Sequence, residues 1–181
     1  MIKLKRIKCK IDLKSIKKLL PFPYNTEADS SDLEVIFAGV SEKKRLLNKH
    51  AWGLKFIGND TFRGFSNKYG PMNPMGLIVV FVEEFDTTDS LRWILCHELT
   101  HYEVGYSPSL YRAFKNLHSK YIKEVENKLN KKWCTKIYLK DNIHDNEPEE
   151  ILCDQVATAI VGENYGRKWW RKQLRKQKCG N

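Results

Sequence analysis

Two histidines and a glutamate form the group of side chains in this sequence whose spacing could do chemistry. They are His97, Glu98 and His101, and they make an HExxH pattern. In a helix, residues four apart project from one face, so both imidazoles could bind the same tetrahedral zinc ion. Glu98 would lie close enough to take a proton from a water on that ion. The spacing therefore predicts a zinc-dependent hydrolytic site.

The residues around this pattern are mostly apolar, which predicts a buried helix. Burying two imidazoles and a carboxylate without partners is costly, and a metal ion with a bound water removes that cost. The alternative is coincidence, in which two core histidines have ordinary hydrogen-bond partners. Chance would place one HExxH in roughly 1% of shuffled chains of this composition. We therefore favour the metal site.

Zinc needs a third protein ligand, whose identity decides the subclass. In the metzincin pattern a glycine and a histidine occupy the positions that Val104 and Ser107 hold here, which excludes that class. Deformylase-type sites use a cysteine in a glycine-rich segment before the helix, and this chain has no such segment. A glutamate on a later helix is the remaining common solution, and Glu150 fits it. Asp154 lies four residues on, where it could accept a hydrogen bond from a ligand histidine. His144 is the main competitor as third ligand.

The acidic residues of this helix also have an ordinary structural explanation. An acid in the first turn is favoured by the helix dipole, and we expect Glu147 and Glu149 to be solvated acids of that kind. The apolar face is expected opposite Glu150 and consists of Ile151, Leu152, Val156 and Ile160. Cys96 and Cys153, each next to a proposed ligand, are expected to pack as small apolar residues.

Two blocks of the chain resemble the ImmA/IrrE group of gluzincin-type zinc metallopeptidases. That group shows Arg-aromatic-x-Leu-Ala-HELGH and later Glu-x-x-Ala-Asn/Asp-x-Phe-Ala, and this chain has RWILCHELTH at 92–101 and EILCDQVA at 150–157. Cysteines stand at the two alanine positions, and Val156 stands in place of the phenylalanine. The resemblance implies zinc ligands at His97, His101 and Glu150, a general base at Glu98, and a supporting acidic position at Asp154.

The resemblance also implies a function. We expect an intracellular, cytoplasmic zinc endopeptidase that cleaves a specific protein, such as a transcriptional repressor, within a phage or mobile element. The fold implied is α+β and zincin-like, with a small, twisted, mostly antiparallel sheet packed on the HExxH helix and a later glutamate-bearing helix. The alternatives are a nucleic-acid-associated module with a zinc site, or a protease that acts on DNA-bound proteins. An intact Glu98 favours the enzyme, because a purely structural zinc site needs no general base.

The elements that must position these residues follow from periodicity and caps. Residues 76–85 give the strongest strand signal, and we expect them to form the sheet edge above the cleft, where an extended peptide could pair. Thr87, Thr88 or Asp89 is expected to cap the HExxH helix. The segment 33–40 fits a strand or a helix, and we favour a strand. The other expected elements are strands at 2–11 and 134–139, a hairpin of 54–57 with 61–65, and helices from Asp12 to before Pro21, from a cap at Ser41 to about Trp52, over 109–131, from about Pro148, and over 167–178. Candidate oxyanion donors are Tyr102, Tyr106, His144 and Tyr165.

Charge and composition limit the remaining function classes. The chain has 181 residues, expected to form one domain over 1–181, and a net charge of +10. Residues 1–18 and 167–181 each carry +7, which leaves −4 on residues 19–166. Nucleic acid is therefore a possible partner of the basic termini, although the pattern at 167–181 favours a terminal helix that packs Trp170 and Leu174 and solvates its charges. No apolar run approaches the roughly 20 residues of a membrane span. Five scattered cysteines without a CxxC pair favour a reduced, cytoplasmic setting.

Overall fold

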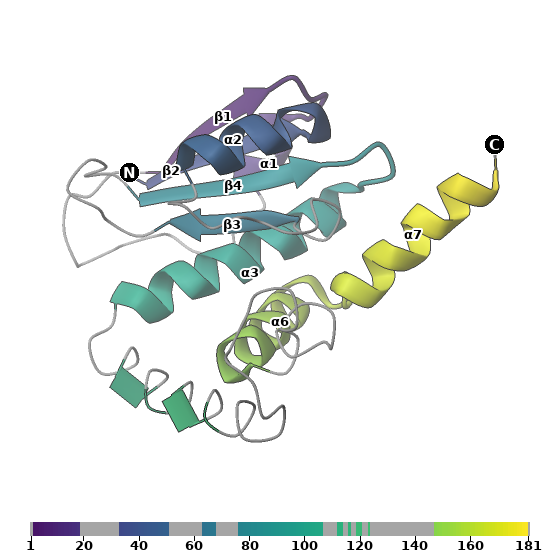
Figure 1. The fold of residues 1–181 in the computed structure, drawn as a ribbon. Coiled ribbons are helices and arrows are strands. Elements are labelled where there is room, and N and C mark those ends of the chain that lie inside the picture. The colour runs from purple at the N-terminus through teal and green to yellow at the C-terminus, as the bar shows by residue number, and fades with distance from the viewer. Residues whose placement is uncertain are drawn as a thin grey trace.

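The chain forms an α+β fold, in which a four-stranded sheet carries helices on both faces (Figure 1). The computed structural model describes residues 2–18, 33–50, 63–67, 76–106 and 147–180, together with six helical residues between 112 and 123. The elements are β1 (Ile2–Ile7), α1 (Leu13–Lys18), β2 (Leu33–Gly39), a 3-10 turn η1 (Val40–Glu42), α2 (Lys43–His50), β3 (Gly64–Asn67), β4 (Gly76–Val82), α3 (Thr88–Tyr106), α6 (Pro148–Val161) and α7 (Arg167–Cys179).

The sheet has the order β1-β2-β4-β3, and its direction differs from the expected one. β1, β2 and β4 run parallel, and only β3 is antiparallel to its neighbour β4. The prediction of a mostly antiparallel sheet is therefore wrong. Helix α1 lies between β1 and β2 in the chain, and α2 lies between β2 and β4, and such crossovers return the chain parallel to the previous strand. The almost continuous burial of β2 and β4 also fits parallel strands that are covered on both faces.

The edge of the sheet is also not the strand that the sequence favours. β4 lies between β2 and β3, so the short strand β3 is the outer one on this side among the described strands. Strong hydrophobicity marks a strand buried on both faces and says nothing of an edge position. The predicted partner of β3, at 54–57, lies outside the described residues.

Two hydrophobic clusters fix the helices to the sheet. On one face, Val35 and Ile78 pack against Leu95 and Leu99 of α3. On the other, Leu46 of α2 packs with the alternate side chains of β2 and β4. Figure 1 shows α6 lying against α3 on the side away from the strands. Helix α3 is thus the layer between the sheet and α6.

Local signals account for several helix starts. Thr87 Oγ1 accepts a hydrogen bond from the Ser90 amide (3.1 Å), and Ser90 Oγ accepts one from the Thr87 amide (2.9 Å), so Thr87 is the cap of α3. Asp12 Oδ1 accepts a hydrogen bond from the Lys14 amide (2.9 Å), and α1 begins at Leu13, one residue after the predicted start. Helix α2 begins at Lys43, because the chain first makes the 3-10 turn η1, so a cap at Ser41 is wrong.

The predicted strand at 33–40 and the helices that begin near Pro148 and at Arg167 are confirmed. The predicted strand at 134–139, most of the helix at 109–131 and the end of a helix at Trp52 lie outside the described residues.

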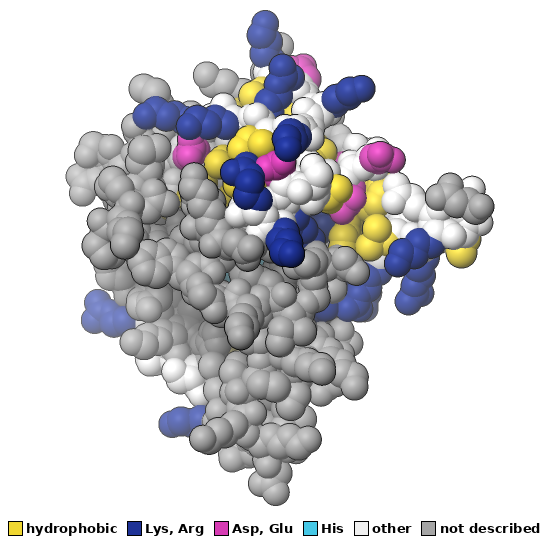
Figure 2. Space-filling view, turned by 45° about the horizontal axis from the view of Figure 1, so that its top comes forward, with side chains coloured by type: hydrophobic (Ala, Val, Ile, Leu, Met, Phe, Trp, Pro, Cys, Tyr) yellow, Lys and Arg dark blue, Asp and Glu magenta, His cyan; other side chains and the backbone are white. Residues whose placement is uncertain are grey.

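Helix α7 projects from the body at the C-terminal end of the described chain (Figure 1). Trp170 is 2% exposed, which confirms that this residue packs on the domain. Figure 2 shows Lys and Arg side chains spread over the described surface, including the projecting segment. Within the described part of the chain, no helix combines the length and the apolar character that crossing a membrane requires.

Candidate metal centre

Helices α3 and α6 together supply every residue of the candidate centre. Pro148 stands in the first turn of α6, where its missing N–H costs nothing, and Gly162 ends the helix with a left-handed backbone (φ 88°). Cys153 and Ala157 are the buried side chains of α6, and Ala157 joins the core cluster of α3. Trp93 Nε1 donates a hydrogen bond to Thr158 Oγ1 (3.1 Å), which also ties the two helices together.

The face of α6 that meets α3 is therefore not the one that its apolar residues suggest. Ile151 is 41% exposed, so the prediction that it lies on the packed face is wrong. The face that packs carries Cys153 and Ala157, with the acidic residues beside them. Polar contacts with the imidazoles of α3 stabilise this orientation, and a hydrophobic pattern taken alone does not register such contacts.

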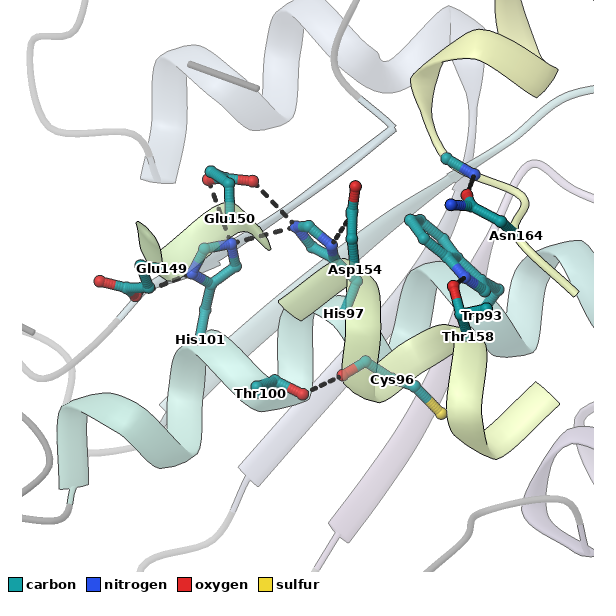
Figure 3. A network of polar contacts seen from close by, with 11 residues as sticks. Trp93, Cys96, His97, Thr100, His101, Glu149, Glu150, Asp154, Thr158 and Asn164 are labelled. Atoms are coloured by element: carbon teal, nitrogen blue, oxygen red, sulfur yellow. Dashed lines mark hydrogen bonds and ion pairs between the residues drawn. The ribbon is translucent and has the colours of Figure 1, made fainter. Parts of the chain in front are cut away.

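The two imidazoles and one carboxylate converge on a single point (Figure 3). His97 Nε2 and His101 Nε2 are 3.1 Å apart. The Glu150 carboxylate bridges them, with Oε2 3.2 Å from His97 Nε2 and Oε1 3.2 Å from His101 Nε2. Ligand atoms of a tetrahedral zinc ion, bonded at about 2.0–2.1 Å, lie about 3.3 Å from one another. The observed spacing fits three ligands of one small cation.

Two further carboxylates hold the outer nitrogens of the imidazoles. Asp154 Oδ1 lies 2.9 Å from His97 Nδ1, and Glu149 Oε1 lies 2.8 Å from His101 Nδ1. A carboxylate can only accept, so each Nδ1 donates and each Nε2 keeps its lone pair for a ligand. The donor set thus fits a cation, either a proton or a metal ion, at the point where the two Nε2 atoms and the Glu150 carboxylate meet.

The electrostatics of these groups favour positive charge at the same point. Burial lowers the pKa of His97, but hydrogen bonds to Asp154 and Glu150 outweigh it and raise the pKa to about 10. The pKa of His101 is likewise raised well above its ordinary value, against the effect of burial, by hydrogen bonds to Cys153 and the neighbouring carboxylates. Where protons are the only cations available, the imidazoles bind them. A divalent cation would compete for the same lone pairs.

The acids at the start of α6 are not solvated, contrary to expectation. Glu149 is the partner of His101, with a side chain 24% exposed. Glu147 is buried, and burial together with the nearby charges of Glu150 and Glu149 raises its pKa to about 8. The first turn of α6 lies against α3, so its carboxylates face imidazoles. The sequence shows the helix but not the side that it turns toward α3.

Cys153 belongs to the centre in a way that the sequence reasoning missed. It is 0% exposed, and its Sγ and one nitrogen each of His97 and His101 all lie within 4.8 Å of one another. These three residues could hold a metal ion. Burial is the main cause of the raised pKa of the Cys153 thiol, and contact with His101 opposes it. Its position three residues after Glu150 was the available signal. Cys96 is buried within the core cluster, as expected.

Glu98 lies beneath the edge strand of the sheet. Its side chain is nearly buried, at 8% exposed. A Cβ added at Gly64 of β3 would lie 2.9 Å from Glu98 Oε1 and 2.9 Å from the carbonyl oxygen of Val79. The strand passes so close to the carboxylate that only glycine fits without a shift. Gly64 is thus a second residue that sequence reasoning did not identify.

The predicted oxyanion donors are not gathered at the centre by the described structure. Tyr102 is a buried member of the core cluster, with its ring against Gly76 of β4. The Tyr165 hydroxyl donates to Glu163 Oε2 (2.9 Å). The side chain of Tyr106 and all of His144, the predicted competitor as third ligand, lie outside the described residues.

Comparison with known proteins adds no further support. No family model matches this chain, and no curated protein and no solved structure matches it either. Support for a metal centre therefore comes from the convergence of His97, His101, Glu150 and Cys153 between α3 and α6.

Proposed function

We propose that this chain is a zinc-dependent peptide hydrolase of the gluzincin type. One observation carries the proposal: the two Nε2 atoms of the HExxH helix lie 3.1 Å apart, and the Glu150 carboxylate lies 3.2 Å from each. In this proposal His97, His101 and Glu150 are the zinc ligands. Glu98 is the general base, and Asp154 and Glu149 orient the ligand imidazoles.

The donor set favours zinc among the common metals. Imidazole nitrogens and one carboxylate suit zinc, and three protein ligands leave a fourth position for water or substrate. Bound there, zinc would polarise the peptide carbonyl and lower the pKa of a water. The carboxylates behind each imidazole make the Nε2 atoms better ligands and fix the orientation of the rings.

Glu98 performs the proton transfers in this proposal. It takes a proton from the attacking water and delivers it to the leaving amine. Its nearly buried position under β3 keeps the carboxylate from swinging into solvent. The ring of Trp93 stacks on His97, with centroids 5.5 Å apart and planes at 29°, and so limits the motion of that ligand.

The edge strand suggests how a protein substrate would be held. β3 pairs with β4 on one side, and among the described strands nothing pairs with its other side. An extended peptide could add to such an edge through main-chain hydrogen bonds and lie across Glu98. This favours an endopeptidase acting on an exposed segment of a specific protein. A transcriptional repressor remains the substrate class that the ImmA/IrrE resemblance implies, and a zincin-like fold is part of the same proposal.

The test compares the wild-type chain with Glu98→Gln, both loaded with zinc. Metal content is measured by mass spectrometry, and hydrolysis is measured on a library of internally quenched fluorescent peptides. We expect about one zinc per chain in both proteins and at least a 10²-fold slower hydrolysis in the variant, because only the proton carrier is lost. A zinc-loaded wild-type chain that cleaves no peptide would contradict the proposal, and so would a variant that cleaves at the wild-type rate.

A second candidate function is favoured by Cys153 alone. If its thiolate binds the metal together with His97, His101 and Glu150, all four positions are filled, which is typical of a structural zinc site. The chain would then be a module that zinc stabilises, such as the nucleic-acid-associated module considered above. The zinc affinities of Glu150→Ala and Cys153→Ser separate the two candidates.

A further inference from the structure

Helix α7 carries an unusually one-sided charge. Its 13 residues include seven Lys or Arg and no acid. Five of these cations share one face, spaced i, i+3, i+4, i+7 and i+8, and they line a groove of about 530 Å³ with Cys179 at its far end: Lys168, Arg171, Lys172, Arg175 and Lys176. All but the half-buried Arg171 are exposed. The row extends over about 12 Å of helix.

This arrangement is unfavourable for the isolated helix. Like charges four residues apart repel, as in Lys168 with Lys172 and Arg171 with Arg175, and no acid lies between them to compensate. Arg167 and Lys168 also oppose the positive end of the helix dipole. None of the ion pairs among the described residues involves the five cations of the groove. An anionic partner would remove this repulsion.

The aromatic residues of α7 are used to anchor it. Trp170 is buried between Lys43 and Arg63, whose charges lie 5.8 and 5.5 Å from its ring. Trp169 packs edge-on against Phe85 and Tyr165, with centroids 6.0 and 5.0 Å away. The helix is therefore held by its first turns, while four of the five cations of the groove remain exposed.

The use of these aromatics also identifies the kind of partner. A helix that lies in a membrane surface needs a free apolar face, and here both tryptophans pack within the protein. Binding of single-stranded nucleic acid relies on aromatic rings that stack on bases, and the same rings are engaged. A row of cations without either feature suits a regular row of phosphates.

We propose that the cationic face of α7 binds the phosphate backbone of duplex nucleic acid without reading its sequence. Lys168, Lys172 and Lys176 supply point charges, and Arg171 and Arg175 supply guanidinium groups that can hold a phosphate with two hydrogen bonds. The site does not depend on hydrolysis at the metal centre. It begins close to that centre, because Gly166, which precedes α7, lies against Trp93 and Asp154.

The test measures binding of a fluorescent 20-base-pair DNA duplex, and of the matching RNA duplex, by anisotropy at several salt concentrations. We expect log K to fall with log salt with a slope of about −4 to −5 for five phosphate contacts. Reversing three charges, as Lys172→Glu, Arg175→Glu and Lys176→Glu together, should weaken binding at least about 100-fold and flatten the slope by about 3 units.

A matched control changes the same net charge elsewhere. Lys10, Lys14 and Lys44 are exposed lysines of the N-terminal half, and their reversal to Glu should leave binding within a few-fold of wild type. Replacing the three α7 residues by Gln, with circular dichroism as a check on folding, guards against loss of the helix. Equal weakening by the α7 triple Glu variant and by the triple Glu variant of Lys10, Lys14 and Lys44 would overturn the proposal, because net charge would then explain binding. Binding that is confined to vesicles of anionic phospholipid, or to an acidic peptide, would also overturn it.

Discussion

At the scale of single residues, the carboxylates of α6 contact different nitrogens of the two imidazoles. Glu150 points at both Nε2 atoms, whereas Asp154 and Glu149 each take one Nδ1. Asp154 lies one helical turn after Glu150 on the same face, and Glu149 lies beside that face, so each carboxylate reaches a different nitrogen. Loss of a ligand and loss of a supporting group should therefore have different consequences.

Single variants of these carboxylates and of Cys153 should differ in their affinity for zinc. Glu150→Ala should abolish stable zinc binding, because one of three ligands is lost. Asp154→Ala and Glu149→Ala should each weaken binding by only about 10–100-fold, because they act through the imidazoles. Cys153→Ser should retain zinc if the enzyme proposal holds. Equilibrium dialysis measures all four, with Glu163→Ala, an exposed acid on the following turn, as control.

Cobalt distinguishes the two candidate functions in the same variants. A thiolate ligand gives Co²⁺ a strong near-ultraviolet charge-transfer band, which imidazole and carboxylate ligands do not give. We expect no such band in the cobalt-loaded wild-type chain. A band that Cys153→Ser removes, together with zinc retention in Glu150→Ala, would instead support the structural centre.

At the scale of elements, the short strand β3 is held by its pairing with β4 and by contacts of the residue that precedes it. It pairs with β4 through Gly64 and Val80, and Arg63, just before it, forms an ion pair with the buried carboxylate of Asp86. Arg63 Nη2 also donates to the Phe81 carbonyl (3.2 Å). Asp86 precedes α3, so this contact fixes the edge strand relative to the helix that carries Glu98.

Gly64→Ala tests this placement. The new Cβ would meet Glu98 and the backbone of Val79 at 2.9 Å, so the carboxylate or the strand must move. We expect hydrolysis to slow by about 10–100-fold with zinc content unchanged, since an error of about 1 Å in a catalytic group has this effect. The free energy of unfolding should fall by about 1–3 kcal/mol. Peptide hydrolysis and urea unfolding are measured beside Ser66→Ala on the same strand, and equal rates in both variants would show that β3 does not position Glu98.

At the scale of the whole molecule, the candidate metal centre lies between two parts of the chain. The sheet and α3 come from the first 106 residues, whereas α6 and α7 begin at 148. The two parts also meet at the core around Ala157, at the bond between Trp93 and Thr158, and where Lys43 and Arg63 lie over the ring of Trp170. Binding of a metal to the folded chain alone stabilises it by mass action.

Removal of the metal should therefore lower the melting temperature. With free zinc at about 1,000 times Kd, the stabilisation is about 4 kcal/mol, which corresponds to roughly 8–16 °C for a chain of this length. Scanning calorimetry with and without a chelator measures it. A His97→Ala, His101→Ala double variant is the control and should show no chelator effect. An unchanged wild-type melting temperature would contradict metal binding at this site.

The size of that chelator effect should depend on pH. The pKa of His97 is raised to about 10 and that of His101 is raised as well, so protons compete with zinc across the neutral range. Each proton must leave before the metal binds, so zinc affinity rises with pH toward 10 and falls as the pH drops. The difference in melting temperature should accordingly shrink from pH 8 to pH 6.

The sequence by itself determined which residues could do chemistry and where several of the local elements lie. The HExxH spacing, the helix beginning at Pro148 and the four-residue step from Glu150 to Asp154 are short-range features, and local geometry is enough to place such side chains on one face. Strand β2 and the start of α3 were likewise predictable from burial patterns and the Thr87 cap.

Only the tertiary structure decided how these elements face one another. Parallel pairing of β1, β2 and β4 depends on how the connections cross the sheet, which no single strand encodes. The approach of Gly64 to Glu98, and the places of Glu149 and Cys153 beside the imidazoles, depend on the rotation of one element against another. That rotation is set by the sum of packing and polar contacts between distant segments, and a periodic pattern along one helix does not contain it.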